Sequence, residues 1–225
     1  MSSQDVASAA RLGKVATVTR KPQISRQERR EEIERRLLDA TERLMGEGAS
    51  FTELSVDRLA TEAGMSRASF YIYFEDKGHL LRRLAGQVFG DLASGAERWW
   101  SVAHRHDPDD VRAAMAAIVA SYRRHQPLLI ALSEMAGYDP QVATTYRELL
   151  AAISDRVAQI IEAGQADGSI RRALPAAATA SALTWMVERT CQQNLPGRAV
   201  DYDSELTSAL TEIIWAALYL SPAEK

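Results

Sequence analysis

The stretch LSVDRLATEAGMSRASFYIYFEDK, residues 54–77, decides the fold of this 225-residue chain. Ser55 can cap a short helix, because apolar residues between Val56 and Ala63 then recur at i, i+3, i+4 and i+7, the spacing of one helical face. Gly64 can end that helix in a left-handed conformation, and Ser66 can cap a second helix. Two short helices joined by a tight glycine turn indicate a helix-turn-helix.

The second of these helices has two different faces. At about 100° per residue, Phe70 and Phe74 share one side, which we expect to be buried. Ala68, Tyr71 and Ile72 point roughly the other way. An exposed face that mixes hydrogen-bonding and apolar groups suits a DNA groove. The sequence therefore predicts that this helix reads DNA.

The same part of the chain resembles the TetR family of bacterial transcriptional regulators. The resemblance covers residues 33–84 and is carried by Ala63-Gly64-Met65-Ser66 and, above all, by Phe70-Tyr71-Ile72-Tyr73-Phe74 with Lys77 three residues beyond. Residues 67–74, together with Glu188-Arg189-Thr190, are similar to the actinobacterial subgroup of ethionamide-resistance regulators. The resemblance implies a three-helix DNA-binding domain over residues 25–80 and a ligand-binding and dimerisation domain over residues 81–225.

Residues at the two helix starts and on the second helix are the candidates for DNA contact. The resemblance implies that Tyr73 and Lys77 hold the DNA backbone, and an apolar Ile72 in a major groove could meet a thymine methyl group. The predicted DNA-binding residues are Ser55, Ser66, Arg67, Ala68, Ser69, Tyr71, Ile72, Tyr73 and Lys77.

Charge is divided unevenly along the chain. The net charge is −3, but residues 1–84 carry 15 Lys and Arg against 13 Asp and Glu, so the negative excess lies in the remainder. Phosphate attraction depends on local charge, and the acidic total is no objection to DNA binding. Residues 1–24 lack apolar periodicity and predict a disordered basic arm, which is either a solvated tail or a source of extra DNA contacts.

The rest of the chain shows helical periodicity and no strand-like alternation. Apolar spacing and capping residues predict further helices over residues 27–47, 77–100, 110–125, 127–137, 140–166, 175–194 and 204–220. The fold class is therefore all-α with about nine helices. The helix over residues 77–100 would connect the two domains. Gly86 and Gly90 on one of its faces predict either close approach of another helix or a bending point.

The aromatic and methionine side chains of the second domain fit either ordinary core packing or a ligand pocket. The resemblance implies a mostly apolar pocket for a lipophilic effector, and such pockets bind lipophilic small molecules. The candidates to line it are Trp99, Trp100, Met115, Ile118, Tyr122, Met135, Tyr146, Leu149, Trp185 and Met186. The resemblance also implies a homodimer through the last two helices, which would present two recognition helices to a palindromic operator in double-stranded DNA.

Nothing in the sequence supports an enzyme. Cys191 is the single cysteine and has no assignable catalytic partner, and His104, His106 and Asp107 form no metal-binding motif. We therefore predict no cofactor and no metal. No apolar run approaches the ~20 residues that cross a bilayer, and the N-terminus lacks a secretory signal, so we expect no membrane partner and a cytoplasmic location.

These observations predict a dimeric, ligand-responsive regulator of transcription, most simply a repressor. Two other classes stay open. One is a constitutive DNA-binding protein without an effector, and the other is a helical small-molecule binding protein whose helix-turn-helix no longer functions. The retained Arg67, Tyr71, Tyr73 and Lys77 argue against the second alternative.

Overall fold

The structure is a computed structural model that describes residues 25–220. Over that range the chain forms α-helices, one short 3₁₀ helix and no strand, which confirms the predicted all-α class. The elements are α1 (Arg26–Gly46), α2 (Val56–Glu62), α3 (Arg67–Tyr73), α4 (Lys77–Val102), η1 (Ala103–Arg105), α5 (Pro108–Arg124), α6 (Gln126–Ala136), α7 (Pro140–Asp167), α8 (Ala176–Asn194) and α9 (Tyr202–Leu218). The predicted arm over residues 1–24 lies outside the described residues.

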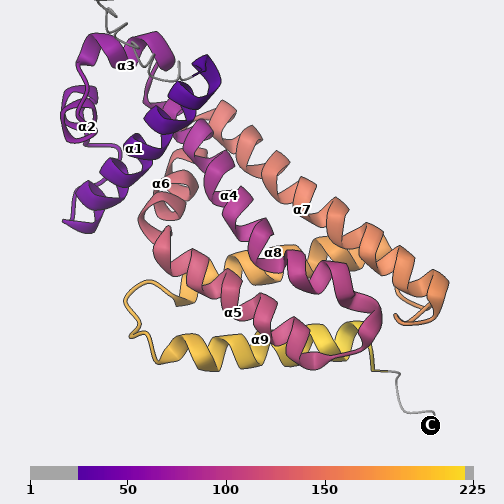
Figure 1. Cartoon of the computed structure of the whole chain (residues 1–225). Helices are drawn as coiled ribbons and strands as arrows, with labels where there is room; N and C mark the ends of the chain where they lie inside the picture. Colours follow the sequence, from indigo (N-terminus) through magenta and orange to yellow (C-terminus); the bar gives the residue numbers. More distant parts are fainter. Residues whose placement is uncertain (1–24, 221–225) are drawn as a thin grey trace, which may run out of the picture.

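Helix α4 connects two groups of helices (Figure 1). Helices α1, α2 and α3 gather around its N-terminal end, and α5 to α9 gather around the remainder. In the second group α7 packs against α4 and α8, and α9 packs against α5. The expected boundary between residues 80 and 81 falls inside α4, so both groups share one continuous helix of 26 residues, about 39 Å long.

Capping residues explain why the helices begin where the sequence predicts. Ser55, Ser66 and Asp76 each accept a hydrogen bond from the backbone N–H three residues later. Asp107 and Asp139 precede a proline at the first position of α5 and α7, where proline is tolerated because its missing N–H would be unpaired anyway.

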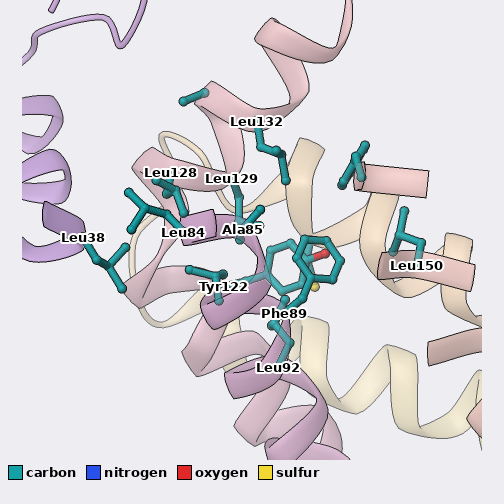
Figure 2. Close-up of a cluster of buried hydrophobic side chains, with 14 of the residues drawn as sticks. Leu38, Leu84, Ala85, Phe89, Leu92, Tyr122, Leu128, Leu129, Leu132 and Leu150 are labelled. Carbon is teal, nitrogen blue, oxygen red and sulfur yellow. The ribbon is translucent and has the colours of Figure 1, made fainter. Parts of the chain in front are cut away.

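One hydrophobic core extends from α1 into the second group of helices. Leu38 of α1 lies near Leu84 of α4 and Leu128 of α6 (Figure 2). The same cluster continues through Phe89 and Tyr122, which are both buried. This core packs α1 directly against α4 and α6.

Two polar contacts also join α1 to α4 and to the second group. Glu34 is 3% exposed and accepts hydrogen bonds from Arg83 Nε at 2.9 Å and Gln87 Nε2 at 3.3 Å, both on α4. Glu42 Oε1 lies 2.6 Å from Nδ1 of the buried His125, between α5 and α6. Each contact bonds a buried side chain to another element, Glu34 to α4 and His125 to α1, so both help to hold α1 in place.

Gly86 and Gly90 of α4 do not mark a close helix contact. A Cβ atom built at either position would meet no atom of the described residues within 4 Å, so the expectation that another helix of this chain approaches there is wrong for residues 25–220. Such an approach occurs instead at Gly95, where a Cβ would lie 3.2 Å from the Cβ of Ala117 on α5. Gly86 and Gly90 are exposed and weaken α4 without a packing benefit within this chain.

Candidate DNA-binding surface and ligand cavity

The turn between α2 and α3 is held against α1. Gly64 adopts a left-handed φ of 67°, which glycine tolerates best. Arg36 of α1 donates to the carbonyl oxygens of Ala63 and Gly64, the latter at 2.8 Å. A Cβ at Gly64 would lie 2.9 Å from Arg36 Nη2, so a side chain there would also disturb this contact. The role of Arg36 was not predicted, because the pattern of a charged helix face does not show which arginine reaches another element.

Helix α3 has the two faces that the sequence predicts. Phe70 and Phe74 are 0% and 1% exposed, and their ring centroids lie 5.2 Å apart. Ile72 is 77% exposed and Tyr71 is 47% exposed, and Ala68 also lies on the surface. The buried phenylalanines therefore fix α3 in the core and present the opposite face to solvent.

The polar residues near α3 differ in how far they are already bonded. The hydroxyl oxygens of Ser55 and Ser66 accept from the backbone N–H groups of Arg58 and Ser69, each at 3.1 Å, so they first serve to start the helices. Arg67 Nη1 lies 3.3 Å from Asp57 Oδ2, and both side chains are exposed. Exposed ion pairs are weak, so the Arg67 guanidinium can exchange this partner for a phosphate.

Lys77 points inward. Its Nζ donates to the carbonyl oxygens of Phe51 at 3.2 Å, Thr52 at 2.8 Å and Leu54 at 2.7 Å. An ammonium group has three donors, and these three carbonyls occupy them. Partial burial lowers the pKa of Lys77. The resemblance matches Lys77 to a contact with the DNA backbone. In this structure its side chain instead bonds to the segment between α1 and α2.

A cavity lies between α4, α5, α7 and α8. The cavity volume is about 70 Å³. Its walls are almost entirely apolar. The lining residues are Phe89, Leu92, Ala93, Ala96, Trp99, Trp100, Met115, Ile118, Tyr122, Leu150, Ile153, Val157, Leu183, Thr184, Val187 and Glu188.

Half of the residues predicted for a pocket line this cavity. They are Trp99, Trp100, Met115, Ile118 and Tyr122. The other predicted residues, which are not among the lining residues, are Met135, Tyr146, Leu149, Trp185 and Met186. On α8 the lining face is formed by the neighbours of Trp185, which is itself 37% exposed. Helical periodicity identifies a face, but it does not show which partner that face meets.

Glu188 is the acidic residue of the cavity wall. It is 3% exposed, and the hydroxyl of Tyr146 donates to its Oε1. Burial raises the pKa of Glu188, and the hydrogen bond from Tyr146 and the charge of Arg189 partly oppose that shift. Tyr146 therefore contacts a residue of the cavity wall, although it does not itself line the cavity.

The described residues give no further sign of chemistry. Cys191 is buried, and burial raises the pKa of its thiol to about 12, which keeps the unreactive thiol form. Between residues 25 and 220 no group of three or more His, Cys, Asp or Glu side chains could hold a metal ion. None of the helices in that range is long and apolar enough to cross a membrane.

Two segments of the chain match known protein families. Residues 37–84 match the family described as "Bacterial regulatory proteins, tetR family", and residues 111–220 match "Transcriptional regulator EthR, C-terminal domain". The HTH-type transcriptional regulator EthR of Mycolicibacterium smegmatis is 27% identical over 202 residues, which cover 89% of this chain and 93% of that protein. EthR of Mycobacterium tuberculosis H37Rv is 26% identical over 162 residues, covering 72% and 74%.

Solved structures share the fold. PfmR, a TetR family regulator from Thermus thermophilus, is 21% identical with a TM-score of 0.62 and covers 83% of this chain and 100% of that chain. FadR from Bacillus subtilis, solved with stearoyl-CoA, is 15% identical with a TM-score of 0.64 and covers 82% and 99%. A regulator from Saccharomonospora viridis, solved with choline, is 18% identical with a TM-score of 0.64 and covers 85% and 100%.

A helix-turn-helix unit joined by one helix to a cavity-bearing helical unit defines a transcriptional regulator rather than an enzyme, and the chain belongs to the TetR family. Within the family its C-terminal part and its sequence relatives place it in the EthR-like subgroup.

Proposed function

We propose that this protein is a dimeric repressor that binds a palindromic operator and is released from it by a lipophilic small molecule. The observation that carries the proposal is the position of α4. Its first residue, Lys77, bonds to the segment between α1 and α2, and its later residues, from Phe89 to Trp100, form one wall of the cavity. A ligand in the cavity and the DNA-binding helices therefore act on the same helix.

The size of the cavity supports release through movement of α4. The cavity volume is about 70 Å³, whereas pockets for drug-sized ligands occupy ~300–1,000 Å³. A larger ligand must push the walls apart. Because Glu34 and the shared core tie α4 to α1, such a movement tilts the helix-turn-helix unit.

Exposed apolar residues on α8 and α9 support a homodimer through the last two helices. Trp185 on α8 and Ile213 on α9 are 37% and 50% exposed, and alanines at 182, 209 and 216 lie exposed beside them in the helical repeat. A two-fold axis along this surface would place two copies of α3 about 34–36 Å apart, one turn of DNA. A change of a few ångströms in that spacing would lower operator affinity.

The proposed DNA contacts divide into two groups. The exposed Ala68, Tyr71 and Ile72 face the bases, and Ile72 meets a thymine methyl group. Arg67 and Tyr73, together with the N-terminal turns that Ser55, Ser66 and Ser69 form, face phosphates. Lys77 contributes by fixing the segment between α1 and α2, and we place the protein's action in the cytoplasm, on double-stranded DNA.

The proposal can be tested by measuring DNA and effector binding on one preparation. Selection from random DNA should return an inverted repeat bound by two or more chains. Lipophilic compounds that raise the melting temperature are then titrated with and without this operator. Because linkage is reciprocal, a true effector binds roughly five- to 150-fold more weakly when operator is present. Equal affinities in both titrations would favour the constitutive regulator without an effector.

A further inference from the structure

Three buried polar atoms at the cavity have no hydrogen-bond partner. Among the described residues only a few buried side-chain polar atoms are in this state, and Trp100 Nε1, Thr184 Oγ1 and Glu188 Oε2 belong to residues that line the cavity. Buried polar groups are normally paired, because an unpaired one loses the hydrogen bonds that water would supply. Three such atoms around one apolar cavity indicate a place where an incoming molecule supplies the missing partners.

The arrangement on α8 favours one kind of partner. Thr184 and Glu188 are four residues apart and therefore share one face of the helix. Glu188 Oε1 already accepts from Tyr146, so Oε2 is the free acceptor of that carboxyl group. Arg189 Nε forms an ion pair with Oε2 at 3.6 Å, which is too long for a hydrogen bond, and the Arg189 side chain is 49% exposed.

We propose that the cavity selects lipophilic molecules that carry an N–H donor, which Glu188 Oε2 and Thr184 Oγ1 accept together. This inference rests on the proposed function and names the chemical class of its effector. The fold has already removed Glu188 from water, so a ligand N–H restores a hydrogen bond without further desolvation of the protein. A protonated amine and an amide both supply this donor, and an amide carbonyl can also accept from Trp100 Nε1.

The same geometry disfavours lipophilic acids. A carboxylate placed in the cavity offers no donor to Glu188 Oε2, and it would be repelled by the ionised form of Glu188. The walls contribute only apolar contact, which does not distinguish molecules of equal chain length. Selectivity among such molecules therefore depends on the polar head group.

Calorimetric titration of four compounds with the same alkyl chain tests the inference. The compounds are octylamine, octanamide, 1-octanol and octanoate, titrated into the full chain at pH 7. We expect octylamine and octanamide to bind at least about ten-fold more tightly than 1-octanol, because their N–H groups can donate to Glu188 Oε2 and Thr184 Oγ1 together whereas 1-octanol has a single O–H, and octanoate to bind most weakly. Tighter binding by octylamine than octanamide would identify the charged donor as the preferred form, and the reverse would identify the amide.

Matched variants assign the preference to α8. Glu188→Gln keeps the size of the side chain and removes its charge, and it should reduce the advantage of octylamine over 1-octanol to less than about three-fold. Thr184→Val keeps the shape and removes Oγ1, and it should weaken both nitrogen compounds without affecting 1-octanol. Glu148→Gln, at an exposed position of α7, removes the same charge outside the cavity and should change nothing. Thermal unfolding verifies that each variant is folded.

The outcomes separate this inference from the proposed function. Equal binding of octylamine, octanamide and 1-octanol, tighter binding of octanoate, or an unchanged preference in both Glu188→Gln and Thr184→Val would overturn the inference. The proposed function would survive those results if 1-octanol or octanoate still released the operator. Conversely, if octylamine binds through Glu188 but neither it nor the other three compounds affects the operator complex, the selectivity is correct and the proposed release is wrong.

Discussion

Polar side chains have hydrogen-bond partners around α3 but partly lack them in the cavity beside α4. Around α3, Arg36 and Lys77 donate to backbone carbonyl oxygens, and the hydroxyl oxygen of Ser66 accepts from a backbone N–H at the start of α3. In the cavity, Thr184 and Glu188 each keep one oxygen without a hydrogen bond. The polar groups of the first region find their partners within the chain, so its exposed face is formed without DNA. The second is left incomplete, at a cost of about 1–3 kcal/mol for each unpaired group.

The largest expected effect is a loss of stability from a substitution in α3. Phe70→Ala should lower the free energy of unfolding by about 3–5 kcal/mol, because Phe70 is fully buried and truncation leaves a cavity. Urea unfolding followed by circular dichroism measures this, with Tyr71→Ala on the exposed face as the control. A loss below about 1 kcal/mol would show that α3 is not anchored as the structure indicates.

Lys77→Met tests whether this lysine completes the fold or contacts DNA. Loss of a charged donor to three carbonyls should lower the free energy of unfolding by about 1.5–3 kcal/mol. Operator and random DNA should be bound more weakly by similar factors, with the salt dependence unchanged. A salt slope reduced by about one, in Lys77→Met but not in Lys77→Arg, would instead show a phosphate contact.

Ile72→Ala tests the exposed face that the anchored helix presents. Ile72 is 77% exposed, so we expect no change in the free energy of unfolding. Loss of contact with a thymine methyl group should cost about 1–3 kcal/mol or less of operator affinity and relax the preference for thymine at one position of each half-site. Selection from random DNA measures that preference, and an unchanged consensus would contradict the base contact.

The link between the two regions can be stiffened. Gly86→Ala and Gly90→Ala should each stabilise α4 by about 0.5–1 kcal/mol, because neither added Cβ meets an atom within 4 Å. If the glycines allow α4 to bend, the double variant should also show a smaller difference between effector affinities with and without operator. Gly95→Ala is the matched control and should gain less stability than either of these variants, since its Cβ would lie 3.2 Å from that of Ala117. Unchanged coupling would mean that α4 moves as a rigid body.

The smallest expected effect is a pH-dependent change in stability at Glu188. Burial raises the pKa of Glu188, so the protonated form is favoured by folding, and this contribution is lost as pH rises through the folded pKa. Glu188→Gln should therefore gain stability relative to the natural chain as pH rises above about 4.5, the ordinary pKa of this carboxyl group. The neighbouring groups Tyr122, Tyr146 and Cys191 have pKa values raised by burial and do not titrate there. Thermal unfolding at several pH values measures the difference, and a constant difference would contradict a raised pKa.

The sequence was a good guide where the physics is local. Each predicted helix from residue 27 onward begins and ends within two residues of its observed bounds, because serine and aspartate caps, prolines and glycines act on their immediate neighbours. The buried Phe70 and exposed Ile72 also follow from helical geometry alone. The sequence predicted that Trp185 and Met186 line the cavity, but adjacent positions of α8 line it in their place.

The sequence by itself therefore determined the class of fold, the two faces of α3 and the kinship with a family of regulators. Only the tertiary structure decided where the long charged side chains go. Arg36 and Lys77 reach partners 28 and 26 residues away in the chain, and Glu188 meets Tyr146 from a different helix. A flexible side chain has many possible partners within its reach, and only the packing of the helices places one of them at hydrogen-bond distance.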